Sequence, residues 1–125
     1  MGGGDARRVL VVDDDDAIRQ LLVDLLSDAG YRVEEARGGR EALEKVRDGG
    51  RPDVILLDKL MPDGDGTMFA ETYARLPGRH APIVGLCASR DGEQWATRIG
   101  AVAHVVKPFD IEHLLSIIAA QVPAA

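Results

Sequence analysis

Two kinds of hydrophobic pattern alternate along the chain. Short apolar runs, rich in β-branched residues, predict strands at residues 9–12, 31–33, 54–57, 83–87 and 102–106. Between and after them, apolar residues recur at helical spacing over residues 18–29, 40–48, 67–76, 92–99 and 111–122. This fivefold alternation is typical of an α/β domain, in which a parallel sheet is covered by helices on both faces and joined by right-handed crossovers.

The polar positions refine this picture. The first, third and fourth runs are apolar throughout, as expected for central strands, whereas Arg32, Glu34 and Glu35 mark the second as an edge strand. Gly30 stands where a left-handed helix cap belongs, and Asp110 is placed to cap the last helix. The DGDG sequence at 63–66 reads as a turn. The apolar face of the first helix is predicted to comprise Ile18, Leu21, Leu22, Leu25, Leu26 and Ala29.

Length and composition favour one compact unit. The 125 residues, 46% of them hydrophobic, suffice for one core, so we predict a single domain over residues 8–123, preceded by a glycine-rich, disordered tail at 1–7. A net charge of −6 disfavours direct nucleic-acid binding. The lone Cys87 excludes an internal disulfide. We expect a cytoplasmic protein, because there is neither an apolar run of about 20 residues nor a signal peptide.

Charged residues follow three of the predicted strands. Asp13 and Asp14 follow the first strand, Asp58 follows the third and Lys107 follows the fifth, so all four are expected at the carboxyl edge of the sheet. Residues 13–16 are four consecutive aspartates. Two carboxylates roughly 4 Å apart repel by about 4 kcal/mol at an effective dielectric of 20. A hard cation such as Mg²⁺, which prefers oxygen ligands, would offset this repulsion. Helix capping and the helix dipole account for the residues at 15 and 16.

Four motifs together resemble the receiver domain of bacterial two-component response regulators, the CheY-like superfamily. They are VVDDDDAIRQLL, PDVILLDKLMPDGDG, IVGLCAS and GAVAHVVKPF, and the resemblance extends over residues 8–122. It implies a flavodoxin-like (βα)5 fold with strand order 2-1-3-4-5. It also implies a phosphoacceptor domain of a phosphorelay that is not an enzyme, beyond self-phosphorylation and self-dephosphorylation.

The resemblance assigns roles to individual residues. Asp58 would accept the phosphoryl group, and Asp13, Asp14, Asp58 and the backbone carbonyl of Leu60 would hold Mg²⁺. Lys107 would pair with the phosphoryl oxygens, and its bond to the following proline is expected to be cis. Such electrostatic stabilisation is what phosphoryl transfer chiefly requires.

Several positions depart from the family pattern. Cys87 replaces the usual Ser or Thr that bonds the phosphoryl group, and a thiol is a weaker donor. His104 replaces the switch aromatic, and Gly85 interrupts a strand. These changes affect the switching step more than phosphorylation. Leu60 and Ser89 occupy positions that influence attack by water, and the apolar Leu60 predicts slow dephosphorylation.

The resemblance also suggests partners. The phosphoryl donor would be a histidine kinase or a phosphotransfer protein. The surface formed by the fourth helix, fifth strand and fifth helix would bind an output partner or a second copy of the chain. Trp95 and Ile117 are candidates for this surface, although ordinary packing is the alternative role for each.

Two other functions stay open at this stage. A degenerate receiver would bind partners without phosphorylation, which Cys87 and His104 favour. A haloacid-dehalogenase-like phosphatase would use Asp13 as nucleophile in a D-x-D-x-T/V pattern, but Ala17 stands where that pattern needs Thr or Val. A nucleotide or flavin site has the least support, because carboxylates take the place of a glycine-rich phosphate cradle.

Overall fold

The computed structural model describes residues 7–48, 51–61, 64–88 and 92–122. Its central sheet consists of five parallel strands in the order β2-β1-β3-β6-β7. Counted along the chain, this is the predicted order 2-1-3-4-5, so the flavodoxin-like fold is confirmed. The strands are β1 (Arg8–Val12), β2 (Arg32–Ala36), β3 (Val54–Asp58), β6 (Ile83–Cys87) and β7 (Ala103–Val106).

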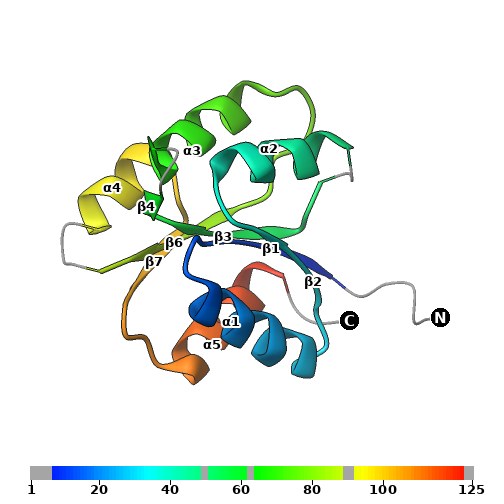
Figure 1. Cartoon of the computed structure of the whole chain (residues 1–125), viewed down its shortest axis with the longest axis vertical. Coiled ribbons are helices and arrows are strands. Elements are labelled where there is room, and N and C mark those ends of the chain that lie inside the picture. Colours follow the sequence, from blue (N-terminus) through cyan, green and yellow to red (C-terminus); the bar gives the residue numbers. More distant parts are fainter. Residues whose placement is uncertain (1–6, 49–50, 62–63, 89–91, 123–125) are drawn as a thin grey trace.

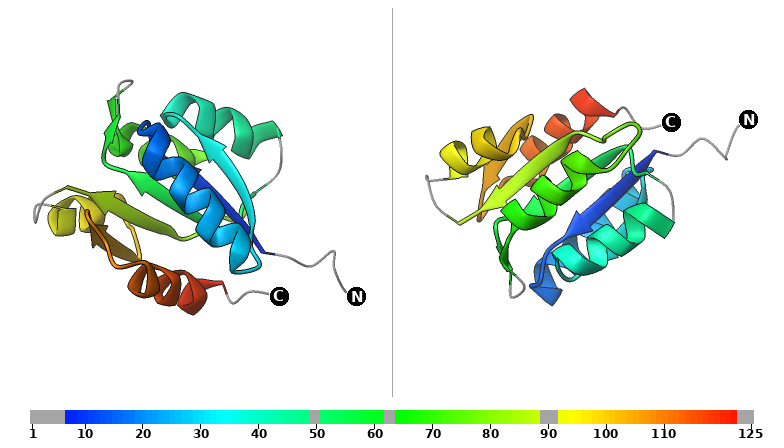
Figure 2. Two further views of the ribbon diagram at one scale, coloured as in Figure 1. Left: turned by 60° about the horizontal axis from the view of Figure 1, so that its bottom comes forward. Right: turned by 90° about the horizontal axis from the view of Figure 1, so that it is seen from above.

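Five helices cover the two faces of this sheet. Figure 1 shows α2, α3 and α4 above the sheet and α1 and α5 below it, and Figure 2 gives two turned views of the same elements. The helices are α1 (Asp16–Asp28), α2 (Gly39–Asp48), α3 (Gly66–Arg75), α4 (Gly92–Ile99) and α5 (Ile111–Gln121). Each predicted helix is present, with ends shifted by at most two residues.

The core is divided between the two faces because side chains alternate along each strand. Every residue of β3 and β6 is buried, as the continuous apolar runs predict for central strands. On β1, Val9 and Val11 pack toward α1 and α5, whereas Leu10 and Val12 pack toward α2, α3 and α4. Strand β2 lies at the edge, as its charged residues predict.

Helix α1 differs from its predicted packing. Leu22 and Leu26 are buried, but Leu21 is 47% exposed and Ala29 is also exposed, so the predicted apolar face is wrong at these two positions. Arg19 is buried instead. The cap is as predicted, because the Asp15 carboxylate accepts hydrogen bonds from the amides of Ala17 and Ile18, but the helix begins at Asp16 and not at residue 18.

The other two caps agree with the sequence. Gly30 has a φ of 99°, a left-handed conformation that follows the C-cap of α1. The Asp110 carboxylate accepts a hydrogen bond from the Glu112 amide and so caps α5.

A short antiparallel hairpin lies between β3 and α3 and was not predicted. It pairs β4 (Leu60–Met61) with β5 (Gly64–Asp65), so part of the turn predicted at 63–66 forms a strand. Gly66, which follows the hairpin, lies against the end of β3, since a Cβ there would lie 2.7 Å from the Asp58 carbonyl oxygen. Glycine is therefore needed where α3 begins, directly beside the end of β3.

Some predictions fall outside the described residues: most of the tail at 1–7, Ser89, and the last residue of the predicted domain, 123. Among the described helices, none has the length and apolar character required to cross a membrane.

Candidate functional site

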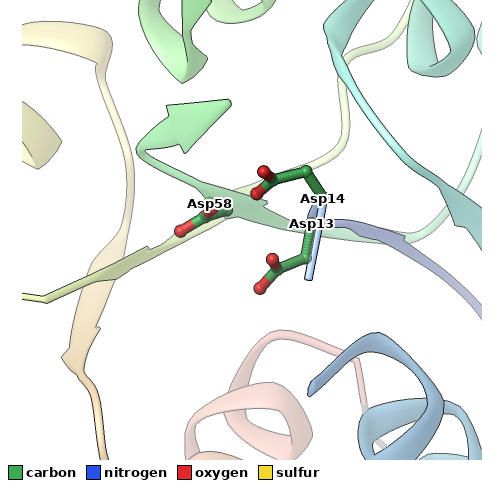
Figure 3. A group of neighbouring side chains, drawn as sticks. All are labelled: Asp13, Asp14 and Asp58. Atoms are coloured by element: carbon green, nitrogen blue, oxygen red, sulfur yellow. The ribbon is translucent and has the colours of Figure 1, made fainter. Parts of the chain in front are cut away.

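The register of the central strands places Asp13 and Asp58 side by side. Val12 pairs with Leu57 in the parallel ladder between β1 and β3, so the next residue of each strand leaves the sheet at the same level. The Asp13 amide donates to the Ala36 carbonyl of β2 at 3.1 Å, which extends this order past the strand end. Figure 3 shows Asp13 and Asp14 at the end of β1 and Asp58 at the end of β3.

Lys107 joins this group from the far side of the sheet. Its amide donates to the Cys87 carbonyl at 2.7 Å, which fixes the backbone at the end of β7. Its Nζ then donates to Asp13 Oδ2 at 3.0 Å and to Asp58 Oδ1 at 3.1 Å. The peptide bond between Lys107 and Pro108 is cis, as predicted. One ammonium therefore bridges two carboxylates that are separated by 45 residues along the chain.

Burial makes these charges interact strongly. The side chain of Asp13 is 0% exposed, that of Asp58 is 8% exposed and that of Lys107 is 19% exposed. Burial, reinforced by the Asp13 carboxylate and opposed by Lys107, raises the pKa of Asp58 to about 6. Burial works to lower the pKa of Lys107, but its two carboxylate partners outweigh that effect, so this pKa is raised and the side chain stays charged.

The acidic group fits a hard divalent cation. Carboxylate oxygens of Asp13, Asp14 and Asp58 all lie within 4.8 Å of one another. The donors are oxygens alone, as Mg²⁺ prefers, and Asp14 is exposed, so a partly hydrated ion has access. Three carboxylates face the single ammonium of Lys107, which leaves a local excess of negative charge. The Leu60 carbonyl, on β4 two residues after Asp58, stays a prediction as a further ligand.

The two predicted switch residues lie together, beside the start of α4. Cys87 is buried, and its thiol lies 3.6 Å from the Val105 carbonyl oxygen, to which it donates. A Cβ placed on Gly92, the first residue of α4, would clash with the Cys87 sulfur and would lie 3.7 Å from His104 Cδ2. His104 is half-buried and is the register partner of Gly85 on the neighbouring strand β6. The structure thus gathers the unusual residues at one end of α4.

Trp95 is a packing residue. It is 4% exposed, and its Nε1 donates to Thr67 Oγ1 of α3 at 2.9 Å. Ile117 is half-buried against the α1 and α5 side of the core. Both therefore take the packing role. The exposed apolar residues on the β7 side of the molecule are Val102 and Val106.

Sequence reasoning missed one residue of the site, Arg19. Its Nη1 donates to the Asp13 carbonyl at 2.8 Å, although Arg19 lies six residues further along the chain, in the first turn of α1. A signal was available, because Arg19 is three residues after Asp16 and on the same helix face as the buried Leu22 and Leu26.

Comparison with known proteins agrees with this site. Residues 9–119 match the family described as the response regulator receiver domain. The chain is 41% identical over 112 residues to the transcriptional regulatory protein PdtaR of Mycobacterium tuberculosis, which covers 87% of this chain and 53% of that protein. It is 42% identical over 112 residues to the response regulator MprA of Mycobacterium leprae, covering 87% and 48%. The chain thus spans about half the length of the curated relatives it matches.

Solved structures are similar over nearly the whole chain. The chemotaxis response regulator CheY4 of Vibrio cholerae is 37% identical with a TM-score of 0.85, and the match covers 94% of this chain and 99% of that one. The response regulator TrrA of Thermotoga maritima, solved in complex with Mg²⁺-BeF, is 32% identical with a TM-score of 0.82, covering 93% and 99%. These matches favour the receiver over the phosphatase alternative. The chain belongs to the response-regulator receiver domains, the signalling modules of two-component systems.

Proposed function

We propose that this receiver domain accepts a phosphoryl group on Asp58, in a reaction that requires Mg²⁺. The observation that carries the proposal is the position of Lys107 Nζ, 3.0 Å from Asp13 and 3.1 Å from Asp58. A phosphoryl group on Asp58 would bring its oxygens next to this ammonium and to the acidic group. The donor is the phosphohistidine of a histidine kinase or of a phosphotransfer protein.

The transfer exchanges one bond to phosphorus for another. A carboxylate oxygen of Asp58 forms the new O–P bond, and the N–P bond of the phosphohistidine breaks. The electron pair of that bond stays on the donor imidazole, which takes a proton from water. Asp13, Asp14, Asp58 and the Leu60 carbonyl would hold Mg²⁺, which would supply neutralisation of the phosphoryl charge. Lys107 adds a fixed positive charge 3.1 Å from Oδ1 of the acceptor.

The protonation state of Asp58 suits this role near neutral pH. With a pKa of about 6, the carboxyl group of the metal-free protein is mainly ionised at pH 7 and above. Only the ionised form is a nucleophile. We place the reaction in the cytoplasm, because the lone Cys87 suits a reducing compartment.

The phosphorylated state is proposed to change the surface of α4, β7 and α5, and so the binding of an output partner or of a second copy. The response is weaker than with a hydroxyl at position 87, because the Cys87 thiol is a poor donor and is packed under Gly92. We also expect slow dephosphorylation, since the apolar side chain of Leu60 is 66% exposed near the acceptor. Loss of the phosphoryl group within seconds in Mg²⁺ buffer would contradict this expectation.

Intact-mass analysis after incubation with acetyl phosphate and Mg²⁺ tests the proposal. The wild type is expected to gain one phosphoryl group, and Asp58→Asn is expected to gain none. Asp24→Asn is a matched control, because Asp24 is an exposed carboxylate on α1. This control should be labelled like the wild type, and omission of Mg²⁺ should suppress labelling of both.

Three outcomes would count against the proposal. A phosphoryl group that persists in Asp58→Asn would exclude Asp58 as the acceptor. Phosphatase activity that is lost in Asp13→Asn but retained in Asp58→Asn would favour the phosphatase alternative, with Asp13 as nucleophile. A wild-type protein that is never labelled and never binds a beryllofluoride mimic would be a degenerate receiver, which binds partners without phosphorylation.

A further inference from the structure

Arg19 is a buried cation beside the acidic run. It is 6% exposed, although arginine is rarely fully buried unless it is paired. Its guanidinium donates in three directions: Nη2 to the Asp16 carboxylate, Nε to the Glu35 carboxylate at 3.0 Å, and Nη1 to the Asp13 carbonyl at 2.8 Å. The two carboxylates compensate its charge. The planar fork of donors then holds the third group, a backbone carbonyl, at a fixed position.

This carbonyl belongs to the peptide unit that connects Asp13 to Asp14. Its orientation therefore sets the directions in which both metal-binding side chains leave the backbone. The side chain of Asp13 is itself held, because Oδ1 accepts from the Asp15 amide at 2.9 Å and Oδ2 accepts from Lys107. Arg19 fixes the part of the same residue that those two contacts leave open, namely the rotation of the peptide that follows it.

Charge alone would make Arg19 unfavourable for a cation site. A guanidinium near the carboxylates lowers the local negative potential, so its electrostatic effect is to weaken Mg²⁺ binding. Its hydrogen bond to the Asp13 carbonyl has the opposite effect, because a ligand pair fixed in advance loses less freedom when the metal binds. The two effects therefore predict opposite changes in Mg²⁺ affinity when the Arg19 side chain is removed.

We infer that Arg19 is a positioning residue for the Mg²⁺ site, which it serves by holding the Asp13–Asp14 peptide. The inference rests on the proposed function, since it requires that Asp13 and Asp14 bind Mg²⁺. Residues that orient metal ligands typically change metal affinity by about 10- to 100-fold when they are replaced.

Calorimetric titration with MgCl2 at constant ionic strength measures this effect directly. We expect Arg19→Gln to bind Mg²⁺ about tenfold more weakly than the wild type. Arg37→Gln is the matched control, because Arg37 lies close enough to act on the pKa of Asp16 and is exposed. That variant removes the same charge without touching the Asp13 carbonyl, so its Mg²⁺ affinity should equal or exceed that of the wild type.

Arg19→Lys separates geometry from charge. The ammonium keeps the positive charge, but it lacks the planar fork and is drawn to the carboxylates of Asp16 and Glu35, so weaker Mg²⁺ binding is expected here too. This variant decides the question if Arg19→Gln does not fold. With acetyl phosphate, the Mg²⁺ concentration for half-maximal labelling should rise, while the labelling rate at saturating Mg²⁺ should stay that of the wild type. A loss of fold stability alone would not produce this shift.

The outcomes separate Mg²⁺ binding by the acidic group from the positioning role of Arg19. A wild-type protein that binds no Mg²⁺ would overturn the proposed function itself. A wild type that binds Mg²⁺, together with folded Arg19 variants that bind it equally or more tightly, would overturn the positioning role and leave the proposed function intact.

Discussion

Trp95 of α4 fills the space above Gly85 of β6. A Cβ built on Gly85 would lie 2.6 Å from Cζ3 of the indole ring, and the ring is fixed on its other side by the hydrogen bond from Nε1 to Thr67. The absence of a side chain at Gly85 therefore leaves room for the indole ring of Trp95. This contact fixes how α4 lies on the sheet, next to the end of β6 where Cys87 is located.

Replacement of Gly85 should disturb this contact. We expect Gly85→Ala to lower the free energy of unfolding by about 1–3 kcal/mol, because the buried indole has no flexible end that could move aside. Urea unfolding of Gly85→Ala, Trp95→Leu and the double variant forms a thermodynamic cycle. The alanine should cost much less in the Trp95→Leu background, and strict additivity of the two changes would show that the contact does not matter.

The raised pKa of Asp58 predicts a pH-dependent stability in metal-free buffer. The folded state takes up a proton at about pH 6, whereas an ordinary aspartate has a pKa of 3.8. Between these values the folded state binds more protons than the unfolded state, so stability falls as the pH rises, and the full loss is present above about pH 6. At about 1.4 kcal/mol per pKa unit, the loss is roughly 3 kcal/mol.

Asp58→Asn tests this pH dependence, because the amide resembles the protonated carboxyl group and does not titrate. Urea unfolding at several pH values, with a chelator present, should show the variant more stable than the wild type at pH 7. The difference should vanish as the pH approaches 4. A difference that grows toward acid pH would contradict the raised pKa.

Removal of Lys107 should leave two buried carboxylates facing each other. Lys107→Met is expected to destabilise the metal-free protein by about 2 kcal/mol at pH 7 and to raise the pKa of Asp58 further, since the bridging ammonium is lost. Thermal unfolding with and without Mg²⁺ provides the measurement. Added Mg²⁺ should stabilise the variant more than the wild type, because the cation replaces the missing charge.

Lys59→Met is the control for Lys107→Met. Lys59 is half-buried and adjacent to Asp58 in the chain. Its described hydrogen bonds are made by its backbone amide and carbonyl, whereas Lys107 bridges the carboxylates through its side chain. Its replacement should change neither stability nor the response to Mg²⁺ to a comparable degree. Equal effects of the two substitutions would mean that the loss of any nearby positive charge, and not of the Lys107 bridge, causes the change in stability.

Tyr31 connects the start of β2 to the end of α5. Its buried hydroxyl donates to the Val122 carbonyl at 3.0 Å, across 91 residues of sequence. Tyr31→Phe should cost about 1 kcal/mol, the net contribution of a typical hydrogen bond. Hydrogen exchange should become faster in the last turn of α5 and stay unchanged in the first turns of α1. Uniform acceleration across the domain would indicate a global rather than a local role.

Much of the architecture could be predicted from local patterns. The apolar runs of β3 and β6 are buried along their whole length, and the caps at Gly30 and Asp110 are where the sequence indicates. The site could be predicted for the same reason: in a parallel sheet, residues that follow different strands meet at one edge. Asp13, Asp58 and Lys107 meet there.

The sequence did not predict which face of α1 is buried near its start. Leu21 and Arg19 lie on different sides of the helix, and hydrophobicity favours burial of Leu21. The structure buries Arg19 and exposes Leu21, because Glu35 of β2 and the Asp13 carbonyl offer the guanidinium its partners. Similarly, the clustering of Cys87 and His104 beside Gly92 depends on how α4 packs, which no local pattern specifies.

The sequence by itself determined the five strand and helix units, the edge and central strands, and the convergence of Asp13, Asp14, Asp58 and Lys107. These follow from periodicity and from the common direction of parallel strands. Only the tertiary structure decided how the buried charges are compensated: Lys107 bridges Asp13 to Asp58, and Arg19 joins the Glu35 carboxylate of β2 to the Asp13 carbonyl. The physical reason is that pairing of buried charges depends on distances between elements, which are set by packing and not by spacing along the chain.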